Sequence, residues 1–228
     1  MKVAYGFFSF TEVTDPAAHH AYNEWHQFDH LPEQYPLPGI VHGQRWVSTP
    51  ACRAARAVSE PPLDPIHYVT CYLMAEPIGP TLDDFFALGK ELHRLDRFFR
   101  ARRAHLTGPF RVETAGANAR VLISAAAVPF RPNRGVYVIV EEPGNDDAAG
   151  ELLTIPGVAG VWTFATDDAL TSPRWTAGAR HITVAWLDDE PLAVAAAIAP
   201  LVAARTGVAF AGPFETITPW RWDWFDRG

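Results

Sequence analysis

Hydrophobic residues recur at two spacings along the chain, which separate predicted strands from predicted helices. Alternating segments rich in β-branched and aromatic residues predict strands at 3–10, 40–47, 66–74, 108–114, 136–141, 157–164, 181–187 and 212–217. Helical spacing predicts helices at 16–31, 82–99, 147–153 and 192–206. Residues 49–65 are rich in proline and predict a loop, and residues 119–128 are a candidate for one more strand.

The first predicted helix has two different faces. Asp15 and Pro16 suit its N-cap and first helical position, and Pro32 predicts that regular helix loosens after Leu31. At 100° per residue one face carries apolar side chains and is predicted to pack on a sheet: Ala21, Trp25, Phe28 and Leu31. The opposite face is polar and carries His19, Asn23, His26, His30 and Glu33, with Tyr22 and Asp29 at its margin.

Three short motifs of the first half recur in the same order in the second half. The matching pairs are LPGIV at 37–41 with IPGVA at 155–159, AEP at 75–77 with DEP at 189–191, and GPF at 108–110 with GPF at 212–214. Their preserved order indicates an internal duplication. The second half has no counterpart of the histidine-rich helix, so we expect any site to lie in the first half.

Each half therefore has the element order βαββαβ, which is that of a ferredoxin-like unit. Two helices cover one face of such a sheet, and its other apolar face must also be buried. The predicted strands carry apolar side chains on both of their faces, as Phe7 and Phe8 show, and this is expected if both faces of the sheet are buried. We predict an α+β fold of two tandem ferredoxin-like units, residues 1–118 and 119–228, packed sheet to sheet as an intramolecular dimeric α/β barrel.

Composition narrows the classes of partner. Hydrophobic residues make up 48% of the chain, enough for a substantial core, and a net charge of −7 without a basic face argues against nucleic acid. The apolar run at 3–10 is too short for a signal peptide or a membrane span, so we predict a cytoplasmic protein that does not bind membranes. Cys52 and Cys71 form no CxxC motif, so we predict two unpaired thiols.

The motif N-x-W-x-x-x-x-H-L-P-E, followed by P-G-I/V at the start of a strand, resembles the EthD-like branch of the dimeric α/β-barrel superfamily. Its residues here are Asn23, Trp25, His30, Leu31, Pro32, Glu33, Pro38, Gly39 and Ile40. The resemblance is good over residues 20–47 and rests on element order elsewhere. It implies a pocket between the first helix and the sheet of its own half, and it matches His30 to the family's histidine. That superfamily spans many reactions, so the fold alone does not define one.

The candidate chemistry lies on the polar face of the first helix. His26 and His30 are four residues apart on one face, which suits a proton relay or two ligands to one metal. Asp29 could orient these imidazoles, whose ordinary pKa of about 6.5 suits general acid/base catalysis. Gln27 stands where an HExxH motif would need Glu, so we predict no metal site. The same face could instead be solvated.

Two predicted strands complete the candidate pocket. One face of the strand at 40–47 carries two polar side chains and one large aromatic side chain, a composition typical of a small-molecule site. The predicted substrate-binding residues are Tyr22, His42, Gln44, Trp46, His67 and Tyr68. We interpret the arginine-rich segment 94–103 as a complement to the helix dipole rather than as a binding site.

The sequence-based prediction is a cofactor-independent enzyme, of the cyclase, isomerase or lyase type, that acts on a small, largely apolar carbonyl-bearing metabolite. His30 would be the main acid/base, assisted by His26 and Asp29. The alternative is a non-catalytic small-molecule-binding or stress-response module. A third hypothesis is a haem protein of the chlorite-dismutase kind. Those proteins place their proximal histidine in the second half, where this chain offers only His181, on a predicted strand. A homodimer stays open.

Overall fold

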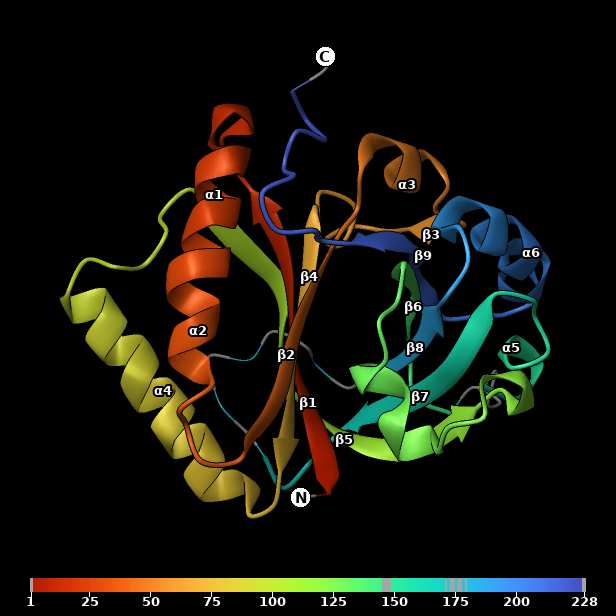
Figure 1. The fold of residues 1–228 in the computed structure, drawn as a ribbon, viewed down its shortest axis with the longest axis horizontal. Helices are drawn as coiled ribbons and strands as arrows, with labels where there is room; N and C mark the ends of the chain where they lie inside the picture. Colours follow the sequence, from red (N-terminus) through yellow and green to blue (C-terminus); the bar gives the residue numbers. More distant parts are fainter. Residues whose placement is uncertain are drawn as a thin grey trace.

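The computed structural model describes residues 2–144, 149–170, 172, 175, 178 and 180–226. Its strands alternate with helices in both halves of the chain (Figure 1). The strands are β1 Val3–Val13, β2 Ile40–Val47, β3 Val58–Ser59, β4 Tyr68–Ala75, β5 Arg102–Ala117, β6 Gly135–Glu141, β7 Val158–Thr166, β8 His181–Leu187 and β9 Val208–Thr216. Every predicted strand outside the bridge between the halves is present, and β2 and β8 have the predicted bounds.

The strands form one closed antiparallel barrel. Their order is β2-β4-β1-β5-β7-β8-β6-β9, and β2 pairs with β9 to close the ring, while the short β3 adds to the far edge of β9. The first-half strands lie in the order β5-β1-β4-β2, and the second-half strands repeat it as β9-β6-β8-β7. The two sheets join along β5–β7 and β2–β9. The predicted α+β barrel is thereby confirmed at the level of a closed barrel with outer helices.

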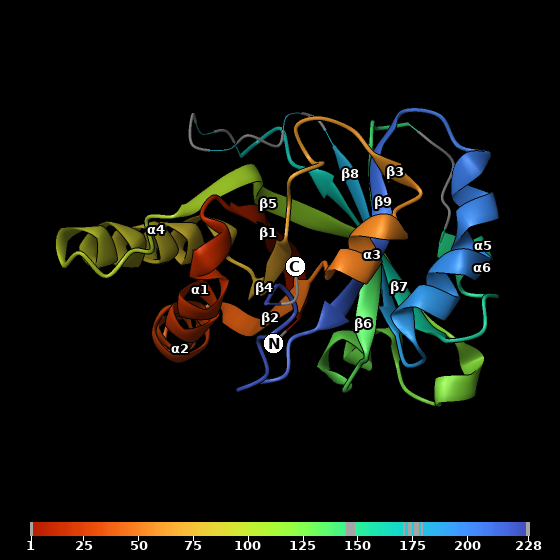
Figure 2. The same cartoon turned by 90° about the horizontal axis from the view of Figure 1, so that it is seen from above.

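The helices lie on the outside of the barrel. Three helices of the first half, α1 His19–Trp25, α2 Leu31–Gln34 and α4 Ile78–Arg94, lie on one side, whereas the short α3, Pro50–Ala54, packs near β9 and α6. Those of the second half, α5 Ala149–Leu152 and α6 Pro191–Ala203, lie on the opposite side, as the view from above also shows (Figure 2). A π-helical segment, His26–His30, joins α1 to α2 without a break in the backbone.

Two predictions about connecting segments are wrong. Residues 119–128 form no strand but 3₁₀ turns, at Ala119–Val121 and Ala125–Phe130. The expected loop at 49–65 contains a short helix, α3 Pro50–Ala54, in addition to β3. Thr49 caps α3 by accepting a hydrogen bond from the Cys52 amide. This N-cap residue was not recognised in the sequence because the many prolines of the segment predicted a loop.

Aromatic side chains fill the inside of the barrel. Phe8 and Phe10 from β1 meet rings from β5, β7 and β9, and all of them are fully buried: Phe110, Phe164, Phe210 and Phe214. Phe8 packs edge-to-face on Phe164 with ring centroids 5.0 Å apart. These rings occupy the barrel interior, so a ligand has to bind outside it.

The two halves differ in how closely helices cover the sheet. In the second half, Val194, Ile198 and Val202 of α6 pack directly on the outer face of β6 and β8. In the first half, α1, α2 and α4 bring large and polar side chains toward the sheet and leave a cavity. No helix in the described ranges is long and apolar enough to span a bilayer.

Candidate functional site

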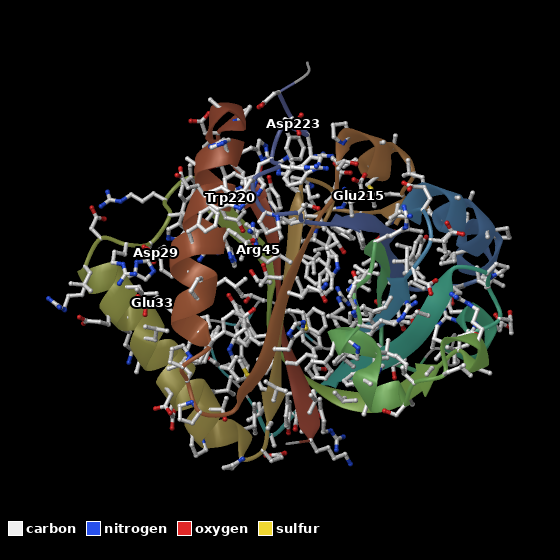
Figure 3. The ribbon with its side chains drawn as sticks, viewed as in Figure 1. Asp29, Glu33, Arg45, Glu215, Trp220 and Asp223 are labelled. Atoms are coloured by element: carbon white, nitrogen blue, oxygen red, sulfur yellow. The ribbon has the colours of Figure 1, made fainter. Side chains whose placement is uncertain are left out.

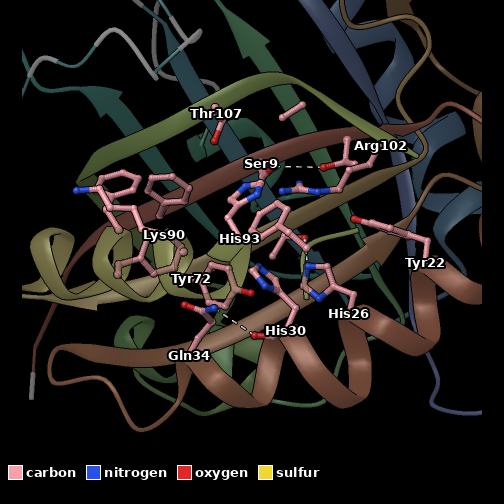
Figure 4. Close-up of a pocket in the computed structure, with 18 residues that line it drawn as sticks. Ser9, Tyr22, His26, His30, Gln34, Tyr72, Lys90, His93, Arg102 and Thr107 are labelled. Atoms are coloured by element: carbon pink, nitrogen blue, oxygen red, sulfur yellow. Dashed lines mark hydrogen bonds between the residues drawn. The ribbon is translucent and has the colours of Figure 1, made fainter. Parts of the chain in front are cut away.

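A cavity of about 490 Å³ lies between the first-half helices and the outer face of β1, β4 and β5 (Figure 4). Its size is typical of a small-molecule or cofactor site. Aromatic side chains form much of its wall: Phe7, Tyr22, Tyr72, Phe85, Phe86 and Phe98. Polar side chains enter between them: Ser9, Thr11, His26, His30, Gln34, Thr70, Lys90, His93, Arg102 and Thr107. Gly89 and Ala104 complete the described lining, which contains no carboxylate.

The histidine-bearing face of the first helix turns toward the sheet, contrary to the prediction that its apolar face would do so. His26 is 4% exposed, whereas Phe28 from the predicted packing face is 43% exposed. Leu31 of the predicted apolar face is nevertheless buried against the sheet. The π-helical turn contributes to this rotation, because the Leu31 amide bonds to the His26 carbonyl five residues earlier.

Regular helix was predicted to loosen near Pro32; the irregular π-helical turn lies before this proline, and helical structure continues past it to Gln34. Pro32 lies directly after the π-helical turn, in the first turn of α2, where a missing N–H is tolerated. Trp25 anchors the preceding turn by donating its indole N–H to the Arg97 carbonyl at 2.8 Å. The indole also stacks on the His30 ring, with centroids 4.6 Å apart.

The structure brings His26 and His30 together at the wall of the cavity. Their rings are nearly perpendicular, with centroids 5.0 Å apart. The Nδ1 atoms of both are buried and lack a hydrogen-bond partner in the described part of the chain. His26 Nε2 lies 3.5 Å from Thr70 Oγ1, at the limit of a weak hydrogen bond. Two imidazoles therefore present unused nitrogen atoms in an aromatic environment.

Both imidazoles are neutral at physiological pH. Burial lowers the pKa of His30 to about 3 and that of His26 well below its ordinary value. Nearby guanidinium groups lower both pKa values further, Arg45 more than Arg102 at His26 and Arg102 more than Arg45 at His30. A neutral imidazole can ligate a metal, but such a low pKa makes it a weak proton acceptor.

Asp29 lies on the outer side of the helix, away from the cavity lining (Figure 3). Arg97 bridges it to Glu33, with Nη2 2.8 Å from an Asp29 carboxylate oxygen and 2.6 Å from one of Glu33. The structure therefore does not bring Asp29 to the imidazoles that it was expected to assist. Its ion pair is partly exposed, and such pairs contribute little to stability.

Replacing Asp29 with Asn is expected to change the free energy of unfolding by less than about 1 kcal/mol, because Arg97 keeps Glu33 as a partner. Urea unfolding measures this change. Glu33→Gln is the matched control, since it removes the other carboxylate from the same guanidinium. A much larger loss in the Asp29 variant alone would contradict the placement of Asp29 in a peripheral ion pair.

The predicted pocket residues of β2 lie on the opposite face of the sheet. Trp46 is 2% exposed inside the barrel and donates its indole N–H to Asn133 Oδ1 at 3.1 Å. Gln44 has the same parity, and His42 contacts Phe130 with ring centroids 5.2 Å apart. None of these three lines the cavity. The other parity, which includes Arg45, faces the helices.

The remaining predicted residues divide between the cavity and a neighbouring cluster. Tyr22 lines the cavity and is fully buried. Tyr68 lies behind the cavity, where its hydroxyl accepts from Asn23 Nδ2 at 2.9 Å and lies 2.9 Å from His19 Nδ1. His67 contacts His19 there, and its Nδ1 accepts a hydrogen bond from the Val13 amide at 3.2 Å.

Several lining residues escaped the sequence analysis. Phe85 and Phe86 lie in the segment 82–99 that was predicted only as a helix, and they form a wall of the cavity as well as packing on Phe7. Arg102 belonged to a segment interpreted as a helix end, but it begins β5 and its guanidinium lies over the Phe98 ring at 4.4 Å. The signal available in the sequence was a charged residue, Arg102, close to a helical segment rich in aromatic residues.

Comparisons with known proteins identify a fold but no family. No family model matches the sequence, and no curated protein matches it. A crystal structure provisionally described as a chlorite dismutase aligns over 99% of this chain and 99% of its own, with a TM-score of 0.54 and 9% identity. A second, provisionally described as a monooxygenase from Lactobacillus acidophilus NCFM, aligns over 95% and 94%, with a TM-score of 0.44 and 6% identity. The first of these supports the barrel fold.

The predicted cofactor-independent isomerase, cyclase or lyase is wrong. The structure that aligns with this chain over 99% of its length is described as a chlorite dismutase, not as an isomerase, cyclase or lyase. The side chains agree with this correction, because His30 is a weak base and Asp29 lies outside the cavity. Within the described ranges, no three His, Cys, Asp or Glu side chains group as a metal site. A metal held inside an organic cofactor needs fewer protein ligands.

Proposed function

We propose that the chain binds haem in the cavity of its first half and serves as a haem protein of oxidative chemistry. The observation that carries this proposal is the pair of neutral imidazoles, His26 and His30, whose Nδ1 atoms have no partner among the described residues at the wall of an aromatic cavity. The fold shared with a structure described as a chlorite dismutase also supports it.

The residues present fit a haem group. A neutral imidazole could hold the haem iron, and burial keeps both histidines in that state. His30 is the better ligand, because Trp25 stacks on its ring and orients it, whereas His26 approaches the Thr70 hydroxyl. Figure 4 places His30 with its ring directed into the pocket.

The rest of the lining suits a flat apolar molecule. Phe7, Phe85 and Phe86 contact one another and offer a continuous aromatic wall. Thr70, Ser9 and other hydroxyl groups lie on the sheet side, where they can hydrogen-bond to small polar ligands. When bound, haem would supply one-electron and oxygen chemistry. The chain itself would hold the group, orient it through His30 and exclude water with its aromatic side chains.

Titration of the protein with hemin, followed by absorption spectroscopy, tests the proposal. We expect a Soret band shifted from that of free hemin and a spectrum typical of imidazole ligation. His30→Ala is expected to lose that spectrum and to bind at least about tenfold more weakly, because its axial ligand is gone. His20→Ala is the matched control, since His20 is exposed on the same helix. A stoichiometric Soret shift that survives in His30→Ala, or no shift in wild type, would contradict the proposal.

We also infer that each half, 1–118 and 119–228, is a ferredoxin-like unit derived from one ancestor. The identical strand orders of the two halves support this, as do the three repeated motifs. Membership of the EthD-like branch rests on the motif around His30 alone. A cytoplasmic location and a homodimer stay predictions, and light scattering coupled to size-exclusion chromatography tests the second.

A further inference from the structure

Two guanidinium groups, that of the partly buried Arg102 and that of the buried Arg45, lie beside the cavity with no acidic partner among the described residues. Arg102 lines the cavity, and its Nε is buried without a hydrogen-bond partner among the described residues. Arg45 is 3% exposed, and both its Nε and its Nη1 also lack partners. Arg45 Nη2 donates a hydrogen bond to Asn23 Oδ1 at 3.0 Å. Buried charge of this kind is rare unless something compensates it.

The neighbouring rings compensate these charges in part. Arg102 lies 4.4 Å from the centroid of Phe98 and 5.6 Å from that of Trp25. Arg45 lies 5.3 Å from the centroid of Tyr22 and 5.7 Å from that of Tyr68. Cation–π contacts stabilise a guanidinium, but they leave its in-plane N–H groups unused. Those groups are arranged to bind a planar oxyanion.

No carboxylate of the described residues fills this role. The described cavity lining contains no Asp or Glu, and two acidic residues of the first helix, Asp29 and Glu33, bind Arg97 on the outside. Lys90, an exposed residue of α4, adds a second cation at the rim of the same cavity. The cavity is therefore apolar in its walls and positive in charge.

We propose that Arg102 binds a carboxylate of the molecule held in the cavity, and that Arg45 strengthens this site through its charge without direct contact. The proposal rests on the proposed function, because it assigns the ligand's orientation within the same cavity. Figure 4 shows the Arg102 side chain reaching from β5 into the space above His26 and His30. The ligand class is a flat, apolar molecule with at least one free carboxylate at its edge.

Metal-free protoporphyrin IX and its dimethyl ester separate carboxylate binding from iron ligation. Both lack iron, so His30 cannot hold them as an axial ligand, and they differ only in the two carboxyl groups. Fluorescence titration of the full chain is expected to show at least about tenfold tighter binding of the free acid, the size of a charge-assisted hydrogen bond. Hemin is titrated in parallel to test the proposed function independently.

Variants at Arg102 identify the residue responsible. Arg102→Gln is expected to bind the acid and the ester equally, while Arg102→Lys retains part of the preference because it keeps the charge but not the planar fork. Arg103→Gln is the matched control, since Arg103 is the exposed neighbour on the same strand. Arg102→Gln removes a buried charge that has no acidic partner, so the variant is expected to fold, which circular dichroism checks.

Each outcome decides one of the two proposals. Equal binding of acid and ester by wild type, or a preference that survives in Arg102→Gln, would overturn the carboxylate site and leave haem binding standing if hemin still gives its imidazole-ligated spectrum. A preference for the acid without imidazole ligation of hemin would support the carboxylate site and overturn the haem function. Failure of all three porphyrins to bind would overturn both.

Discussion

Lowering the pH from about 7.5 to about 5 is expected to destabilise the ligand-free protein strongly, because several buried imidazoles are neutral in the folded state. Burial lowers the pKa of His30 to about 3, that of His67 to about 3 and that of His19 to about 4. Burial also lowers the pKa of His26 well below its ordinary value. In the unfolded chain the same groups have pKa values of about 6.5.

The direction in which the free energy of unfolding changes with pH follows from proton binding. Above about pH 6.5 these histidines are neutral in both states and do not affect stability. Below it, the unfolded chain binds protons that the folded chain excludes, so the free energy of unfolding falls with pH until the folded groups titrate near pH 3. His26 and His30 alone contribute a slope of about 3 kcal/mol per pH unit. His181 opposes this, since its bond to Glu141 raises its pKa and favours the folded state at low pH.

Urea unfolding at several pH values between about 5 and 7.5 measures the slope. The double variant His26→Gln/His30→Gln is expected to lose about two protons of pH dependence, because neither replacement titrates. His20→Gln is the control, since it removes an exposed imidazole from the same helix. Parallel pH profiles of wild type and the double variant would show that these imidazoles are not buried as described.

Truncating one ring of the barrel interior is expected to lower the free energy of unfolding by about 3–5 kcal/mol. Phe8 and Phe164 are the sites of choice, because both are fully buried and they belong to different halves of the chain, on β1 and β7. Their rings meet edge-to-face at 5.0 Å. Each Phe→Ala change would leave a cavity that the surrounding β-sheet cannot close.

The double variant tests whether the two halves share one core. Because the rings touch, the two losses are expected to deviate from additivity by about 0.5–1.5 kcal/mol, and a single unfolding transition is expected throughout. Chemical denaturation monitored by tryptophan fluorescence and by circular dichroism supplies both readouts. Phe28→Ala, at an exposed aromatic ring, is the control and should cost much less. Separate transitions for the two halves, or strict additivity, would argue against a common interior.

The sequence was most informative where burial repeats with a regular period. The segments that became β2 and β8 were predicted with their observed bounds, because β-branched and aromatic residues alternate there between turn signals. The three repeated motifs pointed to two similar halves, and both parities of the strands pointed to two buried faces. Each of these features spans only a few consecutive residues, so the sequence alone was sufficient to predict a closed α+β barrel with outer helices.

The site required the tertiary structure. Trp46 and Arg45 are adjacent on β2, and both neighbours are buried, so alternation could not tell which of them faces the helices. The same ambiguity placed Gln44 and His42 in a pocket that they do not line. The charge pattern around Arg102 suggested a helix end, because its strand neighbours come from distant segments of the chain.

The sequence by itself determined the succession of elements and the polar face that carries His26 and His30, and it predicted a duplication. Only the tertiary structure decided that this face turns inward, that Asp29 turns outward, and that Arg102 joins the imidazoles in one cavity. The physical reason is that amphipathic patterns predict which face is apolar, whereas a binding cavity buries polar groups against that pattern. Which polar groups are buried depends on contacts between segments far apart in the chain.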